Sequence, residues 1–187
     1  EPIVDEDLSG LDFREAVLDG GVFHDCRFVE CSMEGALLRE ASFVECTLQG
    51  ASLSSCQLKN ANFVESDLSG VSFGQAQLVA TKFLNSDMSG VDFSDTELTV
   101  VTITGAVLDG ASFSGATLDR TLLAEARSTH HLDFRGSDMT FATLYKMDLH
   151  DANFAGARLQ SVLLNESVLS KVDFSSVHLE LSQLSKC

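Results

Sequence analysis

A large apolar residue recurs at every fifth position along almost the whole chain. In the stretch ANFVESDLSGVSF these residues are Phe63, Leu68 and Phe73, and a small or β-branched residue stands two places before each. This spacing is neither the 3.6-residue period of a helix nor the two-residue alternation of a strand. It runs without interruption over residues 8–123 and resumes, one residue late, over residues 134–184.

Similar residues also return at a longer interval of 20 residues. Phe stands at 23, 43, 63 and 83, again at 73, 93 and 113, and after the shift at 134, 154 and 174. Such stacking is what a solenoid needs, because each coil buries its apolar edge only against its neighbours. We therefore predict an all-β quadrilateral β-helix, a pentapeptide-type solenoid of about nine coils with four pentads each, about 43 Å long at a strand spacing of about 4.8 Å. Residues 1–187 are expected to form one domain, with the fifth-position residues and those two places before them buried.

The individual pentads resemble those of a known family. ANF at 61–63, SDL at 66–68 and ANF at 152–154 match the consensus Ala-(Asp/Asn)-Leu-x-x of pentapeptide-repeat proteins. The resemblance covers about residues 6–184, and it implies a right-handed β-helix. It implies no single activity, because members of one fold family perform many functions.

The only shift in register falls within residues 124–133. One extra residue there is expected to bulge outward, and it would carry Arg127, His130 or His131 with it. Irregularities on a regular scaffold often have a function, but a solenoid can also tolerate a single insertion that has none. Both interpretations remain open from the sequence.

Four cysteines, Cys26, Cys31, Cys46 and Cys56, occupy the small-residue position of their pentads. A free cysteine behaves there as a small hydrophobic residue, although a disulfide between Cys26 and Cys46 is the alternative. Their spacing fits no zinc motif. Reduced cysteines in a core favour a cytoplasmic protein, and the sequence contains no signal peptide or apolar run long enough for a transmembrane helix.

The net charge of −16 is distributed unevenly over the outward positions. One side of the predicted rod carries the candidate acidic partner face, which consists of Asp67, Asp87, Asp109, Asp148 and Asp151. Averaged over the rod, the charge density is roughly two-thirds of that of duplex DNA. The alternative is a solvated acidic surface that only maintains solubility. Direct binding of nucleic acid is not expected, because 12 basic residues face 28 acidic ones.

Two apolar features are candidates for protein contacts. Val44, Val64 and Leu84 stand at outward positions one coil apart and predict an apolar stripe. The open end of the last coil, with Leu179 and Leu184, predicts either a homodimer through a coil end or a capping segment outside these residues. For the stripe, the alternative is three unrelated surface residues.

No catalytic, cofactor-binding or metal-binding motif is present in the sequence. It lacks a phosphate-binding glycine loop and a nucleophile elbow, and paired carboxylates on a convex rod lack the cleft that shifts pKa values. A surface pair such as His130 and His131 is more often solvated than a metal site, so we expect a non-enzymatic protein without a metal or cofactor.

Two functions remain from the sequence. The first is an interaction or scaffold module that binds a protein partner through its outer faces. The second is an acidic DNA mimic that binds DNA gyrase or topoisomerase IV, since the fold and acidity resemble the quinolone-resistance members of the family. The multi-residue loops and the C-terminal dimerisation segment that many of those members carry are not apparent here.

Overall fold

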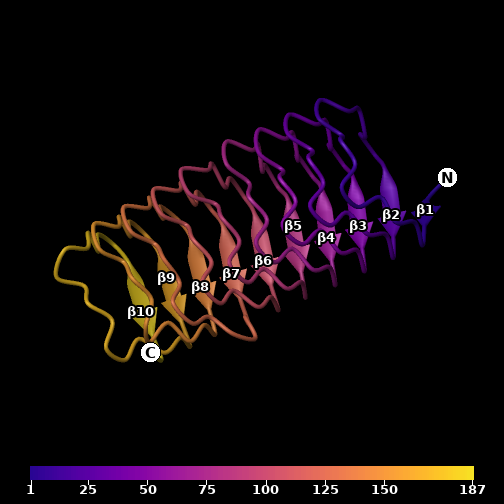
Figure 1. Cartoon of the computed structure of the whole chain (residues 1–187). Coiled ribbons are helices and arrows are strands. Elements are labelled where there is room, and N and C mark those ends of the chain that lie inside the picture. The colour runs from indigo at the N-terminus through magenta and orange to yellow at the C-terminus, as the bar shows by residue number, and fades with distance from the viewer.

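The computed structural model describes all residues, 1–187, as a single parallel β-solenoid (Figure 1). One side of the rod is a 10-stranded sheet whose strands follow one another in chain order. The strands are β1 (Ile3–Val4), β2 (Val22–His24), β3 (Ser42–Val44), β4 (Asn62–Val64), β5 (Lys82–Leu84), β6 (Thr102–Thr104), β7 (Leu122–Ala124), β8 (Thr143–Tyr145), β9 (Leu163–Asn165) and β10 (Gln183–Ser185). The all-β quadrilateral β-helix predicted from the sequence is thus confirmed.

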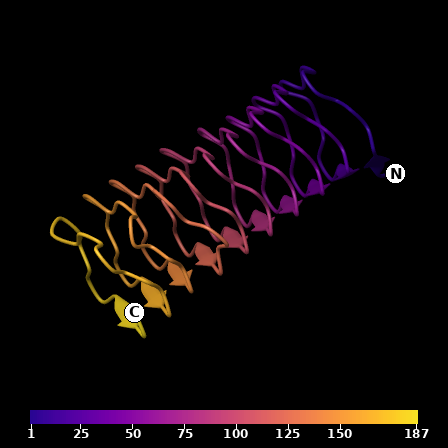
Figure 2. The same cartoon turned by 60° about the horizontal axis from the view of Figure 1, so that its bottom comes forward.

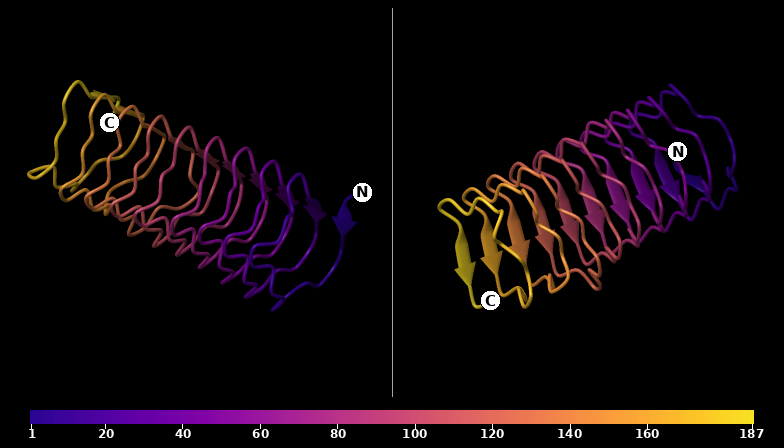
Figure 3. Two further views of the ribbon diagram at one scale, coloured as in Figure 1. Left: turned by 90° about the horizontal axis from the view of Figure 1, so that it is seen from above. Right: turned by 60° about the vertical axis from the view of Figure 1, so that its left-hand side comes forward.

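The other three sides of each coil have no named strands and are held by single parallel bridges between neighbouring coils. Asp67 bridges Asp87 on the first of these sides, Ser52 bridges Ser72 on the second, and Gln57 bridges Gln77 on the third. Figures 2 and 3 show the coils stacked into a straight rod with the two termini at opposite ends. Outward side chains therefore lie in columns along the rod, one residue per coil.

Phenylalanine rings stack along the core in two ladders. The centroids of Phe43 and Phe63 are 5.0 Å apart, and those of Phe63 and Phe83 are 5.1 Å apart. In the second ladder Phe113 and Phe134 stack at 5.1 Å, across the shift in register. Each of these side chains is fully buried. Aromatic contacts of this kind add to the hydrophobic stabilisation that burial itself provides.

In the inner coils the small residue of the pentad is also buried, and most of the polar ones bond to the backbone of the preceding coil. The hydroxyl of Ser66 donates to the carbonyl of Phe43 at 3.3 Å, and the Cys56 thiol donates to the carbonyl of Met33 at 2.9 Å. Burial raises the pKa of Cys46 to about 11 and that of Cys56 to about 12. All five cysteines are free in the structure, so the disulfide alternative is not observed.

The outermost coils depart from the predicted burial. Leu8, Phe13 and Phe174 are only partly buried, and Leu179 and Leu184 are 37% and 46% exposed. Their side chains point inward, but each end coil has a neighbour on one side only. The expectation that every fifth-position residue is buried is therefore wrong at both ends.

The extra residue lies between β7 and the next bridge. Thr104 pairs with Ala124, 20 residues later, whereas Val107 bridges Ser128, which is 21 residues later. The shift is therefore confined to residues 125–128, and the coils on both sides of it are regular.

The hydrogen bonds at this point define a β-bulge. The N–H of Arg127 donates to the carbonyl of Ala106 at 2.7 Å, while the carbonyl of Ser128 accepts from the N–H of Leu108 at 2.8 Å. Two residues thus oppose Val107, which is the arrangement of a bulge.

The corners of the coils contain residues in the left-handed region. Gly, Asn and Asp, which adopt this conformation most readily, stand at many of them. Val100, with φ 60°, and Phe141, with φ 61°, are the least suited residues there. They are 47% and 50% exposed, so packing in the rod does not offset the backbone cost.

We predict that Phe63→Ala lowers the free energy of unfolding by about 3–5 kcal/mol, because it leaves a cavity between two stacked rings. Phe141→Ala is the matched control at an exposed position and should cost less than about 1 kcal/mol. Chemical denaturation followed by circular dichroism measures both. Equal losses for the two variants would contradict the assigned register.

A second prediction concerns the corner at Val100. Val100→Asn should raise the free energy of unfolding by about 1 kcal/mol, since Asn adopts the left-handed conformation with less steric cost. The same measurement applies, with Val79→Asn as the control for the loss of an exposed apolar side chain. A destabilised Val100→Asn variant would show that the side chain contributes packing that outweighs the strain.

Candidate functional site

The five acids of the candidate acidic face lie on one side of the rod, next in chain order after the sheet. Asp67, Asp87 and Asp148 precede the buried column of that side, Asp109 follows it, and Asp151 stands at the adjoining corner. The one-residue bulge does not separate them, because the coils beyond it return to register. The structure divides them into two groups with different neighbours.

Asp67 and Asp87 form the first group, and neither has a cation within ion-pair distance. They bridge each other in adjacent coils. Asp67 accepts a hydrogen bond from the backbone N–H of Ser69 at 2.9 Å, and Asp87 accepts from the backbone and hydroxyl of Ser89 at 3.0 and 2.6 Å. Neutral donors orient both carboxylates, and Arg127 lines the same hollow without forming an ion pair with either of them.

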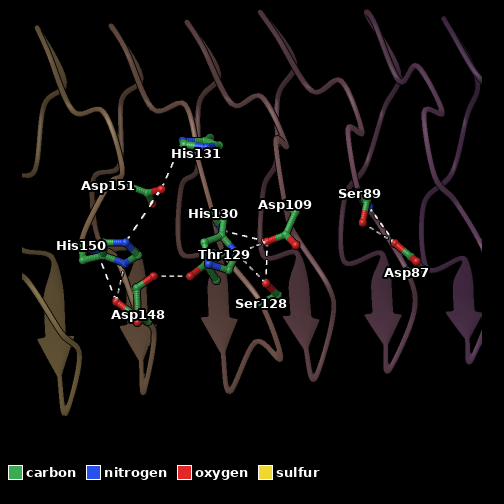
Figure 4. A network of polar contacts seen from close by, with 10 residues as sticks. All are labelled: Asp87, Ser89, Asp109, Ser128, Thr129, His130, His131, Asp148, His150 and Asp151. Atoms are coloured by element: carbon green, nitrogen blue, oxygen red, sulfur yellow. Dashed lines mark hydrogen bonds and ion pairs between the residues drawn. The ribbon is translucent and has the colours of Figure 1, made fainter.

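Asp109 begins the second group, in which each acid contacts a histidine (Figure 4). Its Oδ1 accepts from the hydroxyl of Ser128 at 2.6 Å and from the backbone N–H of His130 at 2.8 Å, and the ring Nδ1 of His130 lies 3.0 Å away. The bond from Ser128 is the main cause that holds the pKa of Asp109 below its usual range, with a smaller contribution from His130.

His150 joins the two remaining acids of the face. Its Nδ1 is 3.1 Å from Asp148, and its Nε2 is 4.0 Å from Asp151, which also lies 3.1 Å from the Nδ1 of His131. The Oδ1 of Asp151 is buried without a hydrogen-bond partner. These contacts are ion pairs only when the imidazoles are protonated.

The sequence placed several of these groups near one another but missed how they pair. His130 and His131 were expected at the bulge; the structure brings them beside His150 and Asp151, and Asp133 pairs with Arg135 on the next side. The contacts with Asp109 and Asp148 were not predicted. The contact of Asp109 with His130 could have been predicted from their separation of 21 residues, which is one coil plus the extra residue of the bulge.

Of the three candidate bulge residues, the bulge itself carries only Arg127. His130 and His131 occupy the same positions in their coil as Asp109 and Gly110 in the preceding one. The guanidinium of Arg127 donates to the carbonyl of Asn85 at 2.9 Å and lines a shallow hollow. The other residues of this hollow are Glu65, Ser66, Asp67, Asn85 and Asp87.

The apolar stripe Val44, Val64 and Leu84 lies on the outer surface of the sheet. The three residues are directly paired across β3, β4 and β5, and all are half-buried. The sequence missed the acids beside them. Asp25, Glu45 and Glu65 occupy the corner between the sheet and the acidic face, one residue per coil.

These surfaces are convex, and they offer little for chemistry. No group of three or more His, Cys, Asp or Glu side chains is arranged to hold a metal ion. The structure has no helix that is long and apolar enough to cross a membrane. The arrangement can orient charge and present apolar contacts to a partner.

Two sequence models of one family match most of the chain. The model described as pentapeptide repeat region matches residues 7–73, and that described as pentapeptide repeats matches residues 56–95, 86–123 and 152–187. The chain belongs to the pentapeptide-repeat family. The resemblance recognised in the individual pentads is thereby confirmed, and the observed parallel solenoid is the fold that it implied.

Two solved structures of QnrB1 share this fold along nearly their whole length. Full-length QnrB1, a plasmid-mediated fluoroquinolone resistance protein, is 23% identical with a TM-score of 0.73, covering 98% of this chain and 93% of its own. A trypsin-treated variant of QnrB1 is 20% identical with a TM-score of 0.60, covering 98% and 90%. HetL, involved in heterocyst differentiation regulation in the cyanobacterium Nostoc, is 20% identical with a TM-score of 0.41, covering 97% and 84%. No curated protein matches the sequence.

The environment of Asp109 generates a prediction for this pentapeptide-repeat protein. Ser128→Ala removes the strongest hydrogen bond to the carboxylate, so the pKa of Asp109 should rise toward its ordinary value. The pKa is measured from the NMR chemical shift of the Asp109 carboxyl carbon, followed over about pH 2–6. Asp12, whose pKa is held at about 2 mainly by Arg14, is the internal control and should not change.

The sign of the effect on stability follows from the lowered pKa. Asp109 contributes stability that is present above its unfolded pKa, close to pH 4, and lost as the pH falls through its folded pKa. In Ser128→Ala this acid-dependent loss should be smaller than in the wild type. An unchanged pKa of Asp109 in the variant would show that the Ser128 contact does not form in solution.

Proposed function

We propose that this protein is a non-enzymatic interaction module whose acidic face binds a positively charged surface of a protein partner. The observation that carries the proposal is the adjacent pair Asp67 and Asp87, which has no cation within ion-pair distance. Several bases on other sides pair with an acid one coil away, as in Arg39 with Asp19 and Arg158 with Asp138. Asp67 and Asp87 instead present two like charges in register in successive coils.

Charge in this arrangement favours association with a basic partner. Carboxylates in successive coils, about 4.8 Å apart, repel one another, and a cationic surface that neutralises them relieves the repulsion. Attraction of this kind raises association rates and weakens with salt, because the Debye length is about 8 Å at physiological ionic strength. The buried reduced cysteines are consistent with a cytoplasmic location, which we also propose.

A second candidate is an acidic mimic of duplex DNA that binds DNA gyrase or topoisomerase IV. Regular carboxylates along a straight rod support it, since their averaged density is about two-thirds that of DNA phosphates. The likeness to QnrB1, a fluoroquinolone resistance protein, concerns the fold and extends over 98% of this chain. The multi-residue loops that many quinolone-resistance members carry have no counterpart here, where the single insertion is the one-residue bulge.

The test of the interaction module uses fluorescent deca-lysine as a cationic probe. Asp67→Asn/Asp87→Asn/Asp109→Asn should weaken its binding by about tenfold at low salt and flatten the salt dependence, because three charges of about 0.5 kcal/mol each are lost. Asp92→Asn/Asp95→Asn/Glu97→Gln removes the same charge from other sides as the matched control. Equal weakening by both triple variants would show that the acidic face has no special role.

Supercoiling assays with DNA gyrase and topoisomerase IV decide the second candidate. The DNA-mimic function predicts inhibition at micromolar concentration by the wild type and by the control triple variant, with loss of inhibition in the Asp67/Asp87/Asp109 variant. The absence of inhibition by the wild type would exclude the mimic and leave the interaction module.

A further inference from the structure

The outer surface of β3, β4 and β5 combines an apolar column with a charged one. Val44, Val64 and Leu84 are in register across the three strands and remain half-exposed. Immediately after the first two, Glu45 and Glu65 stand exposed at the corner. The corner residues adopt left-handed φ values of 54° and 52°, which turns the chain toward the acidic face.

The other flank of the apolar column has a different character. It carries Ser42 and Asn62, and then Lys82, which has no acid within ion-pair distance. Carboxylates thus border the column on one side, and neutral or basic groups border it on the other. A partner that fits has basic residues along one edge of an apolar stripe and none along the opposite edge.

The dimensions of the face favour a helix that lies along the rod. Each strand has three residues and spans about 10 Å, so a helix parallel to the strands would leave the face after two turns. Along the rod the columns repeat once per coil, and the stacked rings beneath are 5.0 and 5.1 Å apart. A helix repeats every 5.4 Å, so the mismatch over three coils stays below about 1 Å.

The geometry points to a docking surface for a basic amphipathic helix of a protein partner, with one apolar residue per turn on Val44, Val64 and Leu84 and Lys or Arg residues facing Glu45 and Glu65. This inference rests on the proposed interaction module and names the kind of segment that it takes. Helices with an apolar face at positions i, i+3 or i+4, and i+7 are a recurrent mode of recognition. The adjoining Asp67 and Asp87 extend the acidic border.

The probe is a labelled 15-residue helical peptide of Leu, Lys and Gln, with Leu on one face and Lys along only one edge of that face, and a scrambled peptide of the same composition is its control. Binding is measured by fluorescence anisotropy at 150 mM salt. The amphipathic peptide should bind at least tenfold more tightly than the scrambled one. Equal affinities would overturn the inference, because charge alone would then explain binding.

Matched variants locate the contact. The triple variant Val44→Thr/Val64→Thr/Leu84→Thr should bind the amphipathic peptide about tenfold more weakly, while its binding of deca-lysine is unchanged. Threonine is used because it is well tolerated in strands. The double variant Glu45→Gln/Glu65→Gln should weaken binding of the amphipathic peptide about fivefold. Two double variants on other corners of the rod serve as controls. Val79→Thr/Val100→Thr controls for the apolar change and Glu15→Gln/Asp95→Asn for the charge change, and each should change the affinity for the amphipathic peptide less than twofold. Circular dichroism and thermal melting confirm the folding of each variant.

Methyl NMR gives an independent readout of the docking position. The amphipathic peptide should shift the methyl signals of Val44, Val64 and Leu84 more than those of Val79 and Val100. Shifts confined to other parts of the rod would overturn the proposed helix-docking surface. So would a threonine triple variant that binds the amphipathic peptide as tightly as the wild type does. Deca-lysine binding through Asp67 and Asp87 would still support the interaction module in that case, so the two failures are distinguishable.

Discussion

The structure depends on the stacking of each coil on the next. A three-residue strand has too little apolar surface to fold alone, and a coil gains stability only when its inward residues meet those of its neighbours. The ring of Phe63 lies between those of Phe43 and Phe83, and the backbone ladder on each side has the same repeat. Packing and hydrogen bonding therefore impose one register on the whole rod.

This constraint explains where irregularities are tolerated. The extra residue between Ala124 and Ser128 is accommodated outside the core, where the bulge leaves Phe113 and Phe134 stacked. Strain is tolerated at corners such as Val100, because the two adjoining sides fix the direction of the chain. The end coils lack one neighbour and expose Leu179 and Leu184, which is a direct consequence of one-dimensional stacking.

The same constraint explains what the sequence could predict. A strict period identifies the inward positions, so the ladder through Phe63 and the buried small residues followed from counting alone. Outward positions obey no period, and their contacts depend on side-chain length and rotamer. The contact of His130 with Asp109 required the position of the bulge to within one residue, and Arg127 reaches back two coils to Asn85, which no spacing rule predicts.

Stacking in register also makes charge placement unusually consequential. Like residues in one column are held about 5 Å apart, where two like charges in water repel by about 0.8 kcal/mol. At some positions an opposite charge one coil away removes this repulsion, as Arg39 does for Asp19. At Asp67 and Asp87 it does not, and serine donors hold both carboxylates in place instead. The proposed basic partner would relieve this repulsion, and it would do so beside the half-buried apolar column of Val44, Val64 and Leu84.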